Sequence, residues 1–290
     1  MKKYNIGIIG RGFVGKAVAF GFSHATGYNS NLFIYDKDKS KSQNSLDELV
    51  SKSDVVFISV PTPSNLDGSM NSEILDDCLN DISTSVDKNN SDQAIYLIRS
   101  TVVPGTSRKF QKKYKNLKIV FNPEFLTERS ANFDFISQTR IILGGIDKKA
   151  LKTVKELYQH RFGESLSVLE TDYESAELIK YLCNNFFAVK VSFLNEMKIV
   201  SDKIGADWND VIEGFIRDGR VGNSHTNVPG PDGKFGFGGS CFPKDIQAMI
   251  NFSEQLNINL NVLRGAWKTN LEVRPEKDWE ELKGRAIIDD

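Results

Sequence analysis

Short apolar runs alternate with longer amphipathic stretches over the first 170 residues of the chain. The runs are residues 4–9, 32–35, 54–60, 94–98, 118–121, 140–145 and 167–170. Apolar runs of this length, bounded by turn-forming residues, are typical of buried strands. The stretches between them are long enough for helices, so strands and helices alternate along the chain. The pattern predicts an α/β fold with a doubly wound parallel sheet.

The pattern becomes helical after residue 170. Thr171 and Glu174 have the spacing of a capping box, which predicts a long helix that runs to Ile204 and ends at Gly205. Its predicted buried face consists of Ala176, Ile179, Cys183, Phe186 and Phe187, which recur at helical spacing.

Two further helices are predicted in the second half. One covers residues 207–217, and the other starts near Asp245, continues past Trp267 and ends or kinks at Pro275. We therefore expect two domains, residues 1–170 around the sheet and a mainly helical domain over residues 171–290. The charged tail from Glu276 onward shows no period for a further domain.

A glycine motif follows the first predicted strand directly. Gly10-Arg11-Gly12-Phe13-Val14-Gly15 lies between that strand and a helix start, which is the context of a Rossmann dinucleotide-binding turn. The second strand ends at Asp36, about 20 residues further on, where a carboxylate accepts hydrogen bonds from the ribose hydroxyls. Asp36 would also repel a 2′-phosphate, so NAD is favoured over NADP, although Lys37 beside it weakens that preference.

Charge and composition exclude several classes of function. A formal net charge of −1 gives no sign of a nucleic-acid partner. No apolar run approaches the ~18 residues of a membrane span, and the Met1-Lys2-Lys3 start lacks a signal-peptide core and cleavage site. The three cysteines and three histidines share no disulfide or metal-ligand spacing. We expect a cytosolic protein without a metal site.

The glycine-rich segment around Cys241 carries the most chemistry. In Phe235-Gly236-Phe237-Gly238-Gly239-Ser240-Cys241-Phe242-Pro243-Lys244-Asp245, a thiol precedes a cation and a carboxylate by three and four residues. A nearby cation favours the nucleophilic thiolate, and the glycines let a ligand approach the backbone. A flexible turn with an unimportant cysteine remains the alternative interpretation.

Other candidates lie at strand ends and on the long helix. Pro61, Thr62, Thr101 and Glu124 follow predicted strands, at the edge where parallel sheets bind ligands. Lys180 and Asn184 are four residues apart, so they lie on one side of the long helix and reach one ligand together. A helix lysine is often solvated, and the apolar neighbours of Lys180 leave both interpretations open.

These segments resemble the UDP-glucose dehydrogenases and related nucleotide-sugar dehydrogenases over nearly the whole chain. The resemblance rests on the glycine motif, Val60-Pro61-Thr62-Pro63, Ser100-Thr101-Val102-Val103-Pro104-Gly105-Thr106, Asn122-Pro123-Glu124-Phe125-Leu126 and the Cys241 segment. Glu177-Leu178-Ile179-Lys180-Tyr181, Asn184 and Asn195-Glu196 also fit the family's central helix.

The resemblance implies a four-electron oxidation of a sugar alcohol to a carboxylate with two NAD molecules, most directly UDP-glucose to UDP-glucuronate. In that family the matching residues act on the substrate as follows: Cys241 forms a thiohemiacetal and a thioester, Lys180 stabilises charge on oxygen, Asn184 positions the substrate, Asp245 and Thr101 hold the water, and Glu124 has an acid/base role. Glu128 and Lys244 match cofactor contacts, while Phe125, Leu126 and Gly238 match substrate-lining positions. Arg220 fits an arginine that reaches the sugar nucleotide across a homodimer interface.

Two departures from the family's pattern affect the substrate more than the reaction. The family's third, UDP-binding domain is absent from this sequence, so a separately encoded domain is one expectation. Residues 229–234 form an insertion in the substrate loop. A two-electron β-hydroxyacid dehydrogenase, which needs no thiol, and an NAD-binding, dimerising remnant without full activity are the alternatives.

Overall fold

The computed structural model describes residues 3–91 and 93–288, and these residues form two compact units. Unit 1 comprises Met1–Thr62 and Ser72–Lys180, and unit 2 comprises Pro63–Asn71 and Tyr181–Asp290. The outer ends of the two expected domains, at residues 1 and 290, lie outside the described residues.

Unit 1 is built on a sheet that contains, among the described residues, seven strands in the order β2-β1-β3-β4-β5-β6-β7. The strands are β1 (Asn5–Ile9), β2 (Asn31–Tyr35), β3 (Val55–Ile58), β4 (Ile95–Ile98), β5 (Lys118–Phe121), β6 (Arg140–Gly144) and β7 (Ser167–Thr171). Every predicted apolar run forms a strand, so the predicted doubly wound α/β class is confirmed. The carboxyl ends of β1 to β5 share one edge, because these strands run parallel.

The expectation of an all-parallel sheet is wrong at one pair of strands. β5 and β6 are antiparallel, with Phe121 opposite Gly144. The connection between them, residues 122–139, carries a 3₁₀ turn at Glu128–Ser130 and the short helix α5 (Ala131–Ile136), about 9 Å long at ~1.5 Å per residue. The antiparallel pairing means that this connection returns the chain to the same edge of the sheet. The chain therefore enters β6 from the edge at which β5 ends.

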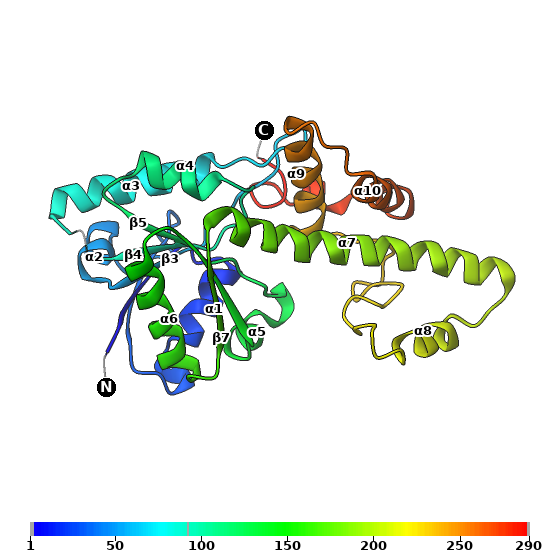
Figure 1. Ribbon diagram of the computed structural model, residues 1–290, viewed down its shortest axis with the longest axis horizontal. Coiled ribbons are helices and arrows are strands. Elements are labelled where there is room, and N and C mark those ends of the chain that lie inside the picture. Colours follow the sequence, from blue (N-terminus) through cyan, green and yellow to red (C-terminus); the bar gives the residue numbers. More distant parts are fainter. Residues whose placement is uncertain (1–2, 92, 289–290) are drawn as a thin grey trace. The chain divides into compact units, whose positions relative to one another are not determined.

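Helices cover both faces of this sheet. Figure 1 shows α2, α3 and α4 on one face and α1, α5 and α6 on the other. Their bounds are α1 (Phe13–Gly21), α2 (Leu46–Lys52), α3 (Glu73–Asn89), α4 (Thr106–Lys113) and α6 (Lys148–Phe162), with 3₁₀ turns η1 (His24–Thr26) and η2 (Glu128–Ser130). Apolar side chains of β1, β3 and β4 pack against α1, α5 and α6 to form the core.

The long helix α7 (Tyr173–Ile204) begins one residue later than a Thr171 cap would place it. Thr171 is the last residue of β7, and its carbonyl accepts a hydrogen bond from Gly145. Asp172 caps the helix instead, because its carboxylate accepts hydrogen bonds from the backbone and side chain of Ser175. The predicted capping box is therefore wrong, although the predicted helix is right.

The buried face of α7 also differs from the prediction. Ala176 is buried, but Ile179, Cys183 and Phe187 are half-buried and Phe186 is 62% exposed. The fully buried positions instead include four polar residues: Glu177, Lys180, Asn184 and Asn195. The apolar spacing predicted the wrong buried face of α7, because polar side chains of this helix point inward and form hydrogen bonds with neighbouring segments.

Unit 2 consists of the rest of α7 and three shorter helices. These are α8 (Trp208–Ile216), α9 (Phe242–Gln255) and α10 (Asn261–Val273), followed by the 3₁₀ turn η3 (Asp278–Glu281). Its core joins Ala188 of α7, Phe237, Ile246 of α9 and Ala266 of α10. Among the described residues, no helix is long and apolar enough to cross a membrane.

The predicted third helix is two helices in the structure. Asn257 follows α9 with a left-handed φ of 58°, a conformation that ends a helix. α9 also begins at Phe242, three residues before the predicted start. The predicted stop is right, because α10 ends at Val273, two residues before Pro275.

Candidate active site

The glycine turn after β1 leaves open space at the start of α1. Gly10 has a φ of +86°, and a Cβ there would lie 2.6 Å from the carbonyl oxygen of Ser59. A Cβ on Gly15 would lie 1.9 Å from the carbonyl oxygen of Gly10. Gly12, the N-cap of α1, has no heavy atom within 4 Å of its Cβ position. The positive end of α1 thus meets open space, which suits a pyrophosphate.

A cavity of about 110 Å³ lies beside this turn, at the edge where the strands end. It is lined by Gly10, Asp36, Lys37 and Pro61, and by Cys78 of α3. β1 is followed by β2 on one side and has β3 on the other, so the cavity lies at the topological switch point of the sheet. The backbone N–H of Arg11 donates to the Asp36 carboxylate at 2.6 Å, which fixes it at the cavity. These residues fit a dinucleotide.

The sequence analysis did not predict Cys78 as a residue of this cavity, because it lies in an ordinary amphipathic helix with no motif around it. Burial raises the pKa of its thiol to about 12, so it lines the cavity as a neutral side chain. Phe13 and Val14 form the first turn of α1 as the motif requires.

Thr62 and Thr101 meet at the ends of neighbouring strands β3 and β4. The Thr62 hydroxyl donates to the carbonyl oxygen of Thr101 at 2.8 Å, and both residues are buried. This bond joins two loops that the sequence singled out separately.

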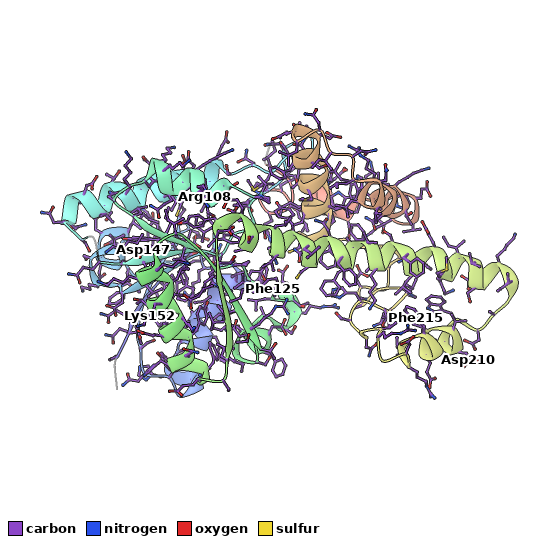
Figure 2. All side chains as sticks on the ribbon, in the orientation of Figure 1. Arg108, Phe125, Asp147, Lys152, Asp210 and Phe215 are labelled. Atoms are coloured by element: carbon purple, nitrogen blue, oxygen red, sulfur yellow. The ribbon has the colours of Figure 1, made fainter. Side chains whose placement is uncertain are left out.

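Glu124 and Lys180 form a buried ion pair in unit 1. Nζ of Lys180 lies 3.0 Å from Oε1 of Glu124 and 2.6 Å from its carbonyl oxygen. The side chain of Lys180 is 4% exposed and that of Glu124 is 8% exposed, so the interpretation of Lys180 as a solvated surface residue is wrong. Nζ also lies 5.3 Å from the centre of the Phe125 ring, the residue labelled in Figure 2 after β5.

The Glu124 carboxylate is ionised in spite of its burial. Burial is the largest influence and raises its pKa, but Lys180, the backbone N–H of Leu126 and Arg99 together bring the pKa below its usual value. The Leu126 N–H donates to Oε2 at 2.6 Å. Leu126 thus contributes through its backbone, and its side chain is half-buried.

A second cluster lies in unit 2 and surrounds Asp245. Its carboxylate accepts a hydrogen bond from the Asn184 amide at 2.5 Å and pairs with Lys244. All three residues are buried, with Asp245 only 1% exposed. Buried charges of this kind are retained when they are paired, and they concentrate at functional sites. Lys244, which was expected to contact the cofactor, forms an ion pair with Asp245.

Cys241 is the N-cap of α9, which the sequence did not reveal. The positive end of a helix favours an anion at this sulfur. Ser240 Oγ lies 3.9 Å from Sγ. Pro243 in the first turn was the available signal, because proline favours the first helical positions.

Three expected site residues lie elsewhere or have other contacts. Glu128 and Arg220 are exposed, and Arg220 pairs with Asp218 at 2.5 Å. Gly238 lies against the guanidinium of Arg274, a residue that the sequence did not single out. Residues 3–91 and 93–288 contain no cluster of acidic, cysteine and histidine side chains that would hold a metal ion.

Known families match both units. Residues 34–162 match the NAD binding domain of the UDP-glucose/GDP-mannose dehydrogenase family, and residues 174–272 match its central domain. The chain belongs to this family. NAD is therefore the cofactor of unit 1, in agreement with the open glycine turn and the cavity at Asp36.

Relatives of this chain agree with the assignment. The UDP-glucose 6-dehydrogenase of Rickettsia prowazekii is 34% identical over 83% of the chain and 54% of the relative. The chain spans about half the length of the curated relatives it matches. A UDP-glucose dehydrogenase structure from Pyrobaculum islandicum has a TM-score of 0.82 at 27% identity, over 93% of this chain and 68% of that one.

The fold is also shared beyond the family. A 3-hydroxyisobutyrate dehydrogenase structure from Mycobacterium tuberculosis has a TM-score of 0.73 at 15% identity and covers 95% of both chains. At this identity the likeness concerns the fold alone.

Proposed function

We propose that this dehydrogenase oxidises the primary alcohol of a nucleotide sugar to a carboxylate, with UDP-glucose as substrate. The observation that carries the proposal is the position of Cys241 at the N-terminus of α9, in the same unit as the buried Asn184–Asp245–Lys244 cluster. A two-electron oxidation of an alcohol needs no thiol, whereas the retention of an aldehyde by covalent capture does. The names of the relatives supply the sugar.

When bound, NAD would supply the hydride acceptor for each of the two oxidations. Residues of unit 1 would hold this cofactor: Gly12 would admit the pyrophosphate, Asp36 would accept hydrogen bonds from the ribose, and Pro61, Thr62 and Thr101 are the proposed contacts at the strand ends. Glu128, Lys37 and Lys244 remain proposed cofactor contacts.

The chain's own residues carry the remaining chemistry. Lys180 stabilises the negative oxygen that forms on the sugar, because a buried cation is worth more there than in water. A water held by Asp245 and Thr101 takes the alcohol proton, and Asn184, which donates a hydrogen bond to Asp245, orients the sugar. Sγ of Cys241 then adds to the aldehyde carbon to give a thiohemiacetal, which is oxidised to a thioester.

Hydrolysis of the thioester needs a base and a positioned water. Glu124 is the proposed base, and its lowered pKa means that it is ionised at neutral pH. Thr101 and Asp245 are the proposed water ligands. Phe125, Leu126, Gly238 and Arg220 are proposed to line the substrate, the last from a second copy.

The stoichiometry of NADH tests this proposal. Purified protein with limiting UDP-glucose and excess NAD is expected to form two NADH per sugar, and Cys241→Ser is expected to stall after the first oxidation. Cys183→Ser, which changes a half-buried thiol of α7, is the matched control and should keep two NADH per sugar. Absence of turnover with any nucleotide sugar, despite NAD binding, would contradict the proposal.

The β-hydroxyacid dehydrogenase expected as an alternative from the sequence is the second candidate. The 3-hydroxyisobutyrate dehydrogenase structure has the same fold over nearly its whole length. A β-hydroxyacid oxidation would give one NADH per substrate and would not depend on Cys241.

We also propose that two copies associate through α7. Within unit 2, Leu182, Phe186, Phe193, Met197, Val200 and Ile204 are 37–73% exposed on this helix. They recur at steps of three, four or seven residues, which places them on one side of the helix as an apolar stripe. A stripe of this size on a soluble protein marks an interaction surface, and a second copy offers a matching stripe by symmetry.

A further inference from the structure

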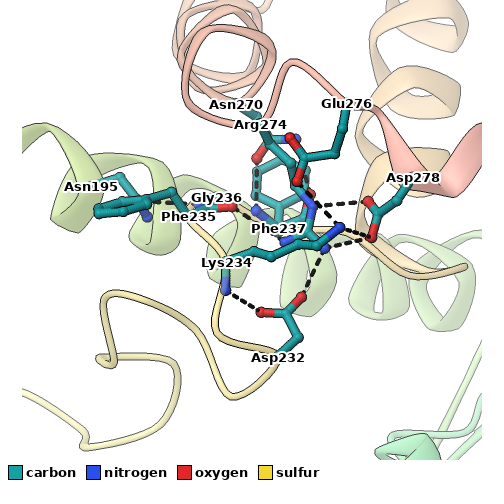
Figure 3. Close-up of polar contacts among 10 residues, drawn as sticks. All are labelled: Asn195, Asp232, Lys234, Phe235, Gly236, Phe237, Asn270, Arg274, Glu276 and Asp278. Atoms are coloured by element: carbon teal, nitrogen blue, oxygen red, sulfur yellow. Dashed lines mark hydrogen bonds and ion pairs between the residues drawn. The ribbon is translucent and has the colours of Figure 1, made fainter.

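Several side chains form hydrogen bonds with the backbone of the segment that leads to Cys241. Phe235–Gly238 forms neither helix nor strand, and Gly236 and Gly239 have φ values of +66° and +72°. Its polar backbone groups therefore lack the partners that regular structure provides. Figure 3 shows that side chains from α7 and from α10 with the residue after it supply them.

Two buried asparagines hold the middle of the segment. Oδ1 of Asn195 accepts a hydrogen bond from the Gly236 N–H at 3.0 Å. Asn270 binds both groups of Phe237: its Oδ1 accepts from the N–H at 2.7 Å, and its Nδ2 donates to the carbonyl oxygen at 3.0 Å. The two asparagines are 1% and 0% exposed. Buried amides are costly unless they are hydrogen-bonded, so these bonds fix the segment strongly.

Arg274 holds both ends of the segment. Its Nη1 donates to the Phe235 carbonyl oxygen at 3.2 Å. A Cβ on Gly238 would lie 2.4 Å from Nη2, so the guanidinium packs directly against this glycine. Arg274 is 2% exposed, and its planar group bridges points that lie three residues apart.

The insertion at residues 229–234 closes over this arginine. Asp232 accepts a hydrogen bond from Arg274 at 2.7 Å, and Asp278 binds the same guanidinium twice, at 2.6 and 2.8 Å. Lys234 in turn pairs with Glu276 and Asp278. The buried charge of Arg274 is thus balanced by carboxylates from the insertion and from the chain after α10.

We propose that Arg274 is a positioning residue for the nucleophile, and that the insertion serves to hold it through Asp232. Arg274, Asn195 and Asn270 act through the backbone of Phe235–Gly238, which begins six residues before Cys241. They keep Sγ at the N-terminus of α9, where it meets the aldehyde. This inference rests on the proposed function of Cys241 as the nucleophile. A nucleophile displaced by ~1 Å loses up to ~100-fold in rate.

The central test replaces the planar guanidinium of Arg274 with the single ammonium group of a lysine. Arg274→Lys keeps one positive charge but cannot bind Phe235, Asp232 and Asp278 at once. We expect kcat to fall ~10- to 100-fold with KM within about threefold, because capture and not binding is impaired. NADH per sugar should fall below two, and the escaping aldehyde should be trapped by semicarbazide. A loss of folded protein alone would lower the rate and leave the stoichiometry at two.

A second measurement needs no turnover. Hydrogen exchange of the peptide spanning residues 235–241 is expected to accelerate at least ~10-fold in Arg274→Lys. The matched control is Arg264→Lys, which changes an arginine of α10, the helix that Arg274 follows, and this arginine pairs with Glu254 on the surface. This control should behave as the wild type in both measurements.

The outcomes separate the two proposals. If Arg274→Lys does not fold, Asp232→Asn on the half-exposed insertion replaces it and should shift both measurements in the same direction, less strongly. Two NADH per sugar with unchanged kcat in the folded variant overturns the positioning role, even where exchange accelerates. If the wild type shows no turnover, the proposed function fails. The exchange and the rate of Cys241 alkylation by iodoacetamide then decide: a change in both supports positioning, and any other result overturns it.

Discussion

Lys180 illustrates how little a single residue reveals before its surroundings are known. In the sequence it is a lysine on a helix, a residue type that is almost always solvated. In the structure it lies beneath the loop after β5, with Glu124 and the ring of Phe125 as neighbours. Two buried charges rarely increase stability over apolar residues of the same size. Their presence is better explained by the charge that the proposed reaction places on oxygen.

The glycine turn allows stability and binding to be separated by two substitutions. Gly15→Ala would place a methyl group 1.9 Å from the Gly10 carbonyl oxygen, so we expect a clear fall in Tm or loss of folding. Gly12→Ala meets no atom within 4 Å and should keep the wild-type Tm. It should nevertheless weaken NAD at least ~10-fold, or ~1.4 kcal/mol, by blocking the pyrophosphate.

Thermal unfolding and a calorimetric titration with NAD measure the two effects. Equal losses of Tm in Gly12→Ala and Gly15→Ala would show that the turn is merely structural. Unchanged NAD affinity in a folded Gly12→Ala would place the pyrophosphate elsewhere.

At the scale of elements, α7 also stabilises a neighbouring helix through Glu177. This carboxylate is fully buried and accepts hydrogen bonds from the backbone N–H groups of Gly105 and Ser107, at 2.6 and 2.7 Å. It thereby caps the start of α4 from another element. Burial, the largest influence, raises its pKa to about 7, while these hydrogen bonds act in the opposite direction.

The raised pKa predicts a pH dependence of stability. The folded state binds the proton of Glu177 more tightly than the unfolded state, so its contribution is fully present below the unfolded pKa of about 4.5. It is lost as the pH rises through about 7. We expect Tm of the wild type to fall relative to Glu177→Gln between these two pH values, because glutamine does not ionise.

Glu174→Gln is the control on the same helix turn. Glu174 pairs with Arg108, labelled in Figure 2, and this arginine lowers the pKa of Glu174. Its variant should therefore keep the wild-type slope above pH 5. Parallel Tm curves for the wild type and Glu177→Gln would refute the raised pKa.

The sequence predicts this fold well where local pattern and tertiary environment agree. The strands are short apolar runs, and the glycine turn has its own signature, so both were readable. The direction of β6 was not, because an apolar run does not encode whether the strand pairs parallel or antiparallel with its neighbour. The buried polar face of α7 was not readable either, since its partners Glu124, Gly105 and Asp245 lie far away in the sequence. Arg274 was missed for the same reason.

At the scale of the whole molecule, the apolar stripe on α7 predicts the oligomeric state. Phe186→Glu would place a charge on the surface that we propose two copies share. We expect the wild type to sediment as a dimer at micromolar concentration and Phe186→Glu as a monomer, because an unpaired buried charge is costly.

Ile258→Glu provides the comparison, since Ile258 is 50% exposed and lies between α9 and α10 and not on α7. This variant should sediment as the wild type does. A monomeric wild type, or a Phe186→Glu variant that remains dimeric, would exclude α7 as the interface.

The packing of Arg274 against Gly238 constrains how these two positions can change during evolution. Any side chain at 238 would collide with the guanidinium, and loss of the guanidinium would leave Asp232 and Asp278 without their shared cation. A substitution at position 238 or 274 alone would therefore impair the packing of this segment. Related sequences that carry a larger residue at 238 should therefore also have replaced the arginine, and should have lost the acidic residue of the insertion with it.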